Sequence, residues 1–168
     1  MTVETTTKVD VVPLTKHIGA EIRGVDLSRD LDRDVIAQIR QAWLDHGVVL
    51  FRGQKLSQDD QVRVTGYFGA LAPLTRPAKF RPPGYDRVHP NIMMISNIRE
   101  NGEPIGALPD GEMMFHHDMI HSEMPDKATL LYSVEIPSAG GNTLFASGYA
   151  AYDTLDPEIR NRLEGRLA

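Results

Sequence analysis

The clearest pattern in the chain is a helical repeat of apolar positions between residues 32 and 45. Its apolar side chains recur every three or four residues, at Val35, Ile36, Ile39, Ala42 and Trp43. That spacing places them on one face of an α-helix. Gly47 follows the repeat, and glycine commonly ends a helix because it tolerates left-handed backbone. The pattern therefore predicts a helix over residues 32–45.

Shorter patterns flank this helix. The segment 18–27 alternates around two glycines, and the segments 11–14 and 48–51 are short and largely apolar. Such alternation and such short apolar runs are typical of β-strands. Ser57 can cap a second helix, because Asp60 stands three residues later, in the first turn. The opening part of the chain is therefore predicted to be α+β.

The pattern weakens in the second half of the chain. The stretch 72–90 contains five prolines and several basic residues, which predicts a long loop. Apolar strand patterns return at 91–96, 113–115 and 128–135. An Asn-Gly pair at 101–102 predicts a tight turn.

Composition and charge narrow the classes of protein. The chain has 168 residues, of which 41% are hydrophobic, and this suits one globular domain or part of one. Its net charge of −5 and the lack of a basic cluster argue against nucleic acid as a partner. It has no cysteine, which excludes disulfides and thiol nucleophiles. With no membrane-length apolar run and no signal-like leader, we expect a soluble, cytoplasmic protein without a membrane partner, and a homo-oligomer is left open.

The candidate chemistry lies in the stretch Phe-His-His-Asp at 115–118. If this stretch is extended, its side chains alternate, so His116 and Asp118 point the same way and His117 points to the other face. One imidazole and one carboxylate are two ligands of the facial triad that holds non-haem Fe(II), and a second histidine from elsewhere would complete it. A His-X-Asp triplet also occurs by chance, with the two side chains merely hydrogen-bonded, so the triplet alone does not establish a metal site.

Other motifs give the triplet a context. They are GAEIRGVDL at 19–27, HGVVLFRG at 46–53, Phe68-Gly69, Ile136-Pro137, Gly140-Gly141-Asn142-Thr143 and AYDTL at 151–155. In this order and spacing, nearly the whole chain resembles the taurine dioxygenase superfamily. These are Fe(II)- and 2-oxoglutarate-dependent oxygenases that include taurine and 2,4-dichlorophenoxyacetate dioxygenases. Phe115 and Asn142 stand where the family more often has Trp and Asp, and neither position is a metal ligand there.

The resemblance implies a fold, a cofactor set and site residues. The fold is a double-stranded β-helix, a jelly roll of the clavaminate-synthase-like kind, with flanking helices. His116 and Asp118 match the iron ligands, and Thr143 matches a threonine that contacts a carboxylate of the cosubstrate 2-oxoglutarate. The implied enzyme uses Fe(II), 2-oxoglutarate and O2 to hydroxylate a small-molecule substrate, with release of succinate and CO2.

The resemblance does not define the substrate. Counting from the family's substrate-binding positions leads to Leu74 and Glu112, and these residue types disfavour taurine itself. Arg76, with Lys79 and Arg81, is a candidate contact for an anionic substrate, and equally a surface charge.

The chain offers only part of the family's ligand set. Nothing after Asp118 matches the family's second histidine ligand or the arginine that pairs with the distal carboxylate of 2-oxoglutarate. We therefore expect residues 1–168 to be a single oxygenase domain that lacks its C-terminal portion. Two other classes stay open. One is a non-catalytic binding or interaction protein derived from the oxygenase fold, and the other is a hydrolase or isomerase with a His-X-Asp metal site on a cupin-like barrel.

Overall fold

A computed structural model describes most of the chain, namely residues 8–72, 88–104, 106 and 113–166. The chain divides into two compact units. The first unit comprises Met1–Val25, Asp32–Gly53 and Pro137–Ala168, and the second comprises Asp26–Leu31 and Gln54–Ile136.

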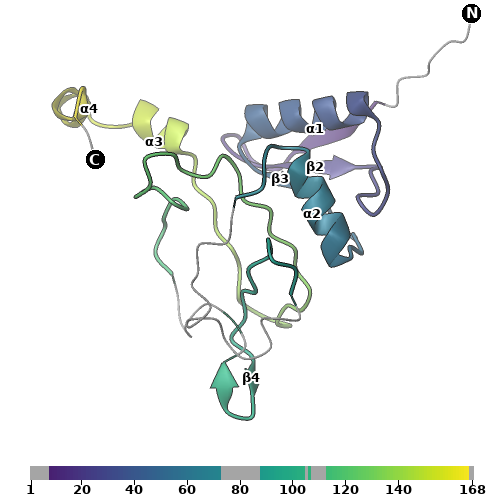
Figure 1. The fold of residues 1–168 in the computed structure, drawn as a ribbon. Helices are drawn as coiled ribbons and strands as arrows, with labels where there is room; N and C mark the ends of the chain where they lie inside the picture. The colour runs from purple at the N-terminus through teal and green to yellow at the C-terminus, as the bar shows by residue number, and fades with distance from the viewer. Residues whose placement is uncertain (1–7, 73–87, 105, 107–112, 167–168) are drawn as a thin grey trace, which may run out of the picture. The chain divides into compact units, whose positions relative to one another are not determined.

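The first unit contains a three-stranded mixed sheet with the strand order β1-β2-β3 (Figure 1). β1 (Asp10–Pro13) pairs antiparallel with β2 (Ala20–Arg23), so that Val11 lies opposite Ile22. β2 pairs in parallel with β3 (Val49–Leu50). These strands confirm the strand patterns in the opening part of the sequence.

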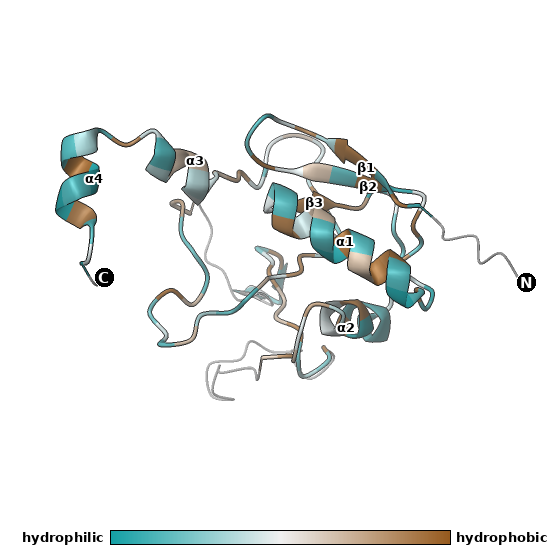
Figure 2. Cartoon of the chain, turned by 90° about the horizontal axis from the view of Figure 1, so that it is seen from above, coloured by the Kyte–Doolittle hydropathy of each residue, from teal (hydrophilic) through white to brown (hydrophobic). Residues whose placement is uncertain are grey.

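Helix α1 (Arg33–His46) packs against β2 and β3. Its buried residues share one face and, with Val9 and two residues of β2, form the core of this unit: Val35, Ile39, Ala42, Val9, Ala20 and Ile22. Figure 2 shows hydrophobic and hydrophilic residues interspersed along the helix, as an amphipathic helix requires. Gly47 ends α1 with a φ of 70°, and its N–H donates to Trp43 O at 2.8 Å. The predicted helix is confirmed with a shift of one residue at each end.

Helix α2 (Gln58–Gly66) belongs to the second unit and begins with a reciprocal cap. Asp60 N donates to Ser57 Oγ at 3.1 Å, and Ser57 N donates to Asp60 Oδ2 at 3.0 Å. This arrangement satisfies two backbone donors that the first turn leaves without helical partners. Val64, only 2% exposed, is the buried residue of the helix. The capping prediction for Ser57 is confirmed.

Arg63 joins α2 to the segment Asp26–Leu31 of the same unit. Its guanidinium donates to Arg29 O at 2.7 Å and to Leu27 O at 3.0 Å. The same group donates to Asp60 Oδ1 at 2.9 Å. One side chain therefore fixes the first turn of α2 against an irregular segment that has no strand partner to hold it.

The second half of the described chain has little regular structure. A short hairpin pairs β4 (Arg99–Glu100) with β5 (Glu103–Pro104) around the predicted Asn-Gly turn, whose residues have φ values of 52° and 84°. Positive φ at both central residues is the conformation that Asn-Gly favours in two-residue hairpins. The turn prediction is confirmed.

The strand predictions at 91–96, 113–115 and 128–135 are wrong, because none of these segments forms a strand. Their apolar patterns favour extended backbone, but a strand also needs a neighbouring strand to complete its hydrogen bonds. Among the residues that the structure describes, no such neighbour pairs with them.

Two short helices follow. α3 (Gly148–Asp153) begins after Ser147, and α4 (Pro157–Leu163) begins after Asp156, whose carboxylate accepts from Glu158 N at 2.8 Å. No helix in the described ranges is long and apolar enough to cross a membrane. The α+β character is thus confirmed, whereas the described residues form two small sheets and not a double-stranded β-helix.

Candidate metal site

His116 and Asp118 lie side by side in the second unit. His116 Nε2 is 3.2 Å from Asp118 Oδ1, and His116 Nδ1 is 2.9 Å from Met114 O. Because a carbonyl oxygen can only accept, the proton of a neutral His116 ring lies on Nδ1 in this hydrogen bond. Nε2 of that neutral ring then carries a lone pair and lies beside Asp118 Oδ1, so both atoms can bind a metal ion.

The second oxygen of Asp118 has a partner of its own. Thr129 Oγ1 donates to Asp118 Oδ2 at 2.7 Å. The side chains of His116 and Asp118 are 53% and 50% exposed, so an ion can reach them from solvent. One imidazole nitrogen and one carboxylate oxygen are a donor set that suits Fe(II) and similar divalent metals.

The backbone around the pair is irregular and turns directly after it. Residues 113–117 run without regular secondary structure, and a turn begins at Asp118. Met119 has a φ of 55°, and Ser122 N donates to Met119 O at 2.9 Å. The chain therefore reverses directly after the carboxylate.

Two other histidines of the second unit have different contacts. His117 Nδ1 is 3.0 Å from the backbone oxygen of Asp118, and His89 Nδ1 accepts from Asn91 N at 3.1 Å. In the part of the chain that the structure describes, no three His, Cys, Asp or Glu side chains form a group that could hold a metal ion. These residues therefore bring two ligands together and do not supply the third.

Thr143 follows a turn that requires glycine. Gly140 and Gly141 have φ values of 76° and 66°, and a Cβ on Gly141 would come within 2.8 Å of Pro137 Cγ. Thr143 itself is exposed, and its side chain makes no hydrogen bond within the described residues, so its hydroxyl is available to a ligand. It belongs to the first unit, whereas His116 and Asp118 belong to the second.

The predicted substrate contacts Leu74, Arg76 and Glu112 lie outside the described residues. Thr129 is a site residue that sequence reasoning missed, because a threonine eleven residues beyond Asp118 in an apolar stretch carries no recognisable signal.

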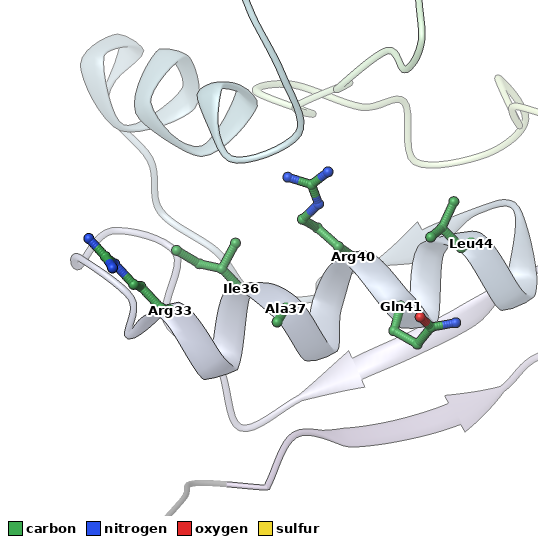
Figure 3. Close-up of a pocket in the computed structure, with 6 residues that line it drawn as sticks. All are labelled: Arg33, Ile36, Ala37, Arg40, Gln41 and Leu44. Atoms are coloured by element: carbon green, nitrogen blue, oxygen red, sulfur yellow. The ribbon is translucent and has the colours of Figure 1, made fainter.

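A separate hollow runs along one face of α1 (Figure 3), with a volume of about 410 Å³. It is lined by Arg33, Ile36, Ala37, Arg40, Gln41 and Leu44. The hollow contains neither a histidine nor a carboxylate, so it lacks the residue types that hold Fe(II) and those that act as a general base.

Comparisons with known proteins agree with the motifs. The profile described as "Taurine catabolism dioxygenase TauD, TfdA family" matches residues 10–168. An alpha-ketoglutarate-dependent sulfate ester dioxygenase of Pseudomonas putida is 35% identical over 153 residues, which cover 91% of this chain and 46% of that protein. An (S)-phenoxypropionate/alpha-ketoglutarate-dioxygenase of Sphingobium herbicidovorans is 28% identical over 155 residues, which cover 92% of this chain and 50% of that protein.

Solved structures show the same relationship. The crystal structure of a taurine dioxygenase from Burkholderia xenovorans matches with a TM-score of 0.69 and 32% identity, covering 94% of this chain and 52% of that one. Dioxygenases of this type have a jelly-roll fold. The chain spans about half the length of the relatives that it matches.

Proposed function

The chain belongs to the taurine catabolism dioxygenase TauD/TfdA family, and from this membership we propose that it forms part of an Fe(II)- and 2-oxoglutarate-dependent dioxygenase with a jelly-roll fold. In this proposal His116 Nε2 and Asp118 Oδ1 are iron ligands. The observation that carries it is their 3.2 Å approach, with the other ring nitrogen of His116 bound to Met114 O. Histidines that hold metals almost always donate their second N–H in this way.

Each proposed site residue has a distinct task. His116 and Asp118 bind the metal and are not acids or bases, and Asp118 also brings a negative charge that offsets part of the charge of the ion. The Thr143 hydroxyl donates a hydrogen bond to a carboxylate of 2-oxoglutarate. Bound iron supplies the redox chemistry that couples decarboxylation of 2-oxoglutarate to hydroxylation of the substrate, with release of succinate and CO2. A facial triad needs one further protein ligand, so the proposal assigns two of its three positions to this chain.

We further propose a small organic anion as the substrate. The relatives named above are a sulfate ester dioxygenase and a phenoxypropionate dioxygenase, and sulfate esters and phenoxypropionate are both anions. Arg76, Lys79 and Arg81 are basic residues of this chain that such an anion could meet.

Metal binding tests the proposal most directly. In the full-length protein, His116→Ala and Asp118→Ala should each abolish stoichiometric iron binding and substrate-dependent formation of succinate. His117→Ala is the matched control, because it removes a neighbouring imidazole and should leave iron binding intact. Iron retained by the His116→Ala variant would refute the ligand assignment. A protein without any metal affinity would favour the non-catalytic interaction protein.

A further inference from the structure

The hydrogen bond from Thr129 to Asp118 distinguishes the two oxygens of this carboxylate. Oδ2 accepts from Thr129 Oγ1 at 2.7 Å, while Oδ1 faces His116 Nε2 at 3.2 Å. A distance of 2.7 Å lies in the range of short, charge-assisted O–H···O⁻ bonds. Such a bond restrains rotation of the carboxylate group. Without it, a half-exposed aspartate would keep this rotational freedom.

We propose that Thr129 is a positioning residue that makes Asp118 a ligand through one oxygen only. This inference rests on the proposed function, in which Asp118 binds iron. While its hydroxyl occupies Oδ2, only Oδ1 is directed toward the metal position beside His116. A carboxylate that bound through both oxygens would take up a further coordination position, and the facial triad depends on keeping positions open.

Both ligands are oriented in the same way, by a hydrogen bond with a neighbouring residue. Met114 O fixes the ring of His116 through Nδ1, and Thr129 fixes the carboxylate of Asp118 through Oδ2. In each ligand, the polar atom that does not face the metal position is hydrogen-bonded to a neighbouring residue. Both donor atoms are therefore oriented before the ion binds. A hydroxyl suits this task because it is neutral. A lysine or arginine in its place would offset the negative charge that the metal needs.

The test compares variants of Thr129 with Mn(II) alone as the probe. Mn(II) is titrated into the full-length protein without 2-oxoglutarate, and the free ion is followed by its electron paramagnetic resonance signal. Thr129→Val keeps the shape and removes the hydroxyl, and it should weaken Mn(II) binding by about 10- to 100-fold, the usual cost of losing a partner of a metal ligand. Thr129→Ser keeps the hydroxyl and should restore most of the affinity.

Thr65→Val is the matched control. Thr65 belongs to the same unit and donates its hydroxyl to Gln61 O at 2.7 Å, within the region of α2. The substitution removes a threonine hydroxyl whose hydrogen bond has the same length as that of Thr129. This hydroxyl does not contact the metal ligands. Mn(II) affinity should stay at the wild-type value in this variant.

The outcomes separate the inference from the function on which it rests. If Asp118→Ala keeps wild-type Mn(II) affinity, the proposed metal site is wrong. If Asp118→Ala loses the ion while Thr129→Val keeps it, only the positioning role is overturned. Equal losses in the Ser and Val variants would also overturn it, because retaining the hydroxyl would then give no advantage in Mn(II) affinity. If circular dichroism shows that Thr129→Val is unfolded, the comparison of Thr129→Ala with Thr129→Ser decides the same question.

Discussion

At Thr143, a single hydroxyl is proposed to recognise the cosubstrate. The side chain is exposed and has no hydrogen-bond partner among the described residues, and the glycine turn at 140–141 precedes it. A hydrogen bond to a charged group is worth roughly 1.5–3 kcal/mol. Thr143→Ala should therefore weaken 2-oxoglutarate binding by about one to two orders of magnitude, measured by calorimetry with Mn(II) present.

The control for this prediction is the metal itself. Mn(II) affinity without 2-oxoglutarate should hardly change in Thr143→Ala, whereas Thr129→Val should weaken it. Thr143→Ser should keep most of the cosubstrate affinity. An unchanged dissociation constant for 2-oxoglutarate in Thr143→Ala would remove Thr143 from the site.

Single residues also show how far the sequence could predict the site. The sequence predicted that His116 and Asp118 lie together from the alternation of side chains in an extended stretch, whereas residues 113–117 have no regular secondary structure and a turn begins at Asp118. The contacts of Met114 O and Thr129 did not follow from it. Both depend on irregular backbone whose path no local pattern specifies, although together they orient the two ligands.

Among the elements, α1 and α2 were predictable because their signals are local. Gly47 and Ser57 mark a helix end and a helix start through contacts within four residues. The predicted strands at 91–96 and 128–135 failed because a strand depends on hydrogen bonds to a neighbour that lies far away in sequence. The bounds of α1 were therefore predicted to within one residue, while half of the strand predictions lacked the partner that they required.

The start of α2 also makes a prediction about acid stability. A hydrogen bond from Ser57, followed by the interaction with Arg63, lowers the pKa of Asp60 from 3.8 to about 2. A carboxylate whose pKa is lower in the folded state stabilises the fold above its unfolded pKa, and this contribution disappears as the pH falls through the folded pKa. The free energy of unfolding should therefore decrease as the pH falls from 3.8 to 2.

Denaturant unfolding across this pH range measures the effect. Asp60→Asn should lose less stability on acidification than the wild type, because it has no carboxylate to protonate. Asp59→Asn is the matched control, since it removes the adjacent exposed carboxylate from the same turn and should keep the wild-type slope. Parallel pH profiles for the wild type and Asp60→Asn would show that this cap does not contribute to the acid response.

For the molecule as a whole, several apolar side chains of the second unit are strongly exposed. Phe115 is 69% exposed, and Met114 and Val134 are 88% and 87% exposed. Side chains of this kind normally stabilise a protein by leaving water. Contiguous exposed apolar surface favours contact with further polypeptide. The buried core, by contrast, is concentrated around α1 and the β1-β2-β3 sheet.

Ligand number and exposed apolar surface together predict the behaviour of residues 1–168 as an isolated polypeptide. His116 and Asp118 supply two donors, the described residues offer no third, and two donors hold Fe(II) weakly. The polypeptide should therefore give no substrate-dependent succinate when supplied with Fe(II), ascorbate, 2-oxoglutarate and candidate sulfate esters or phenoxy acids. A taurine dioxygenase assayed with taurine under the same conditions is the positive control. Succinate that depends on both substrate and His116 would place the third ligand within these residues, with His121 and His89 as the first candidates for substitution.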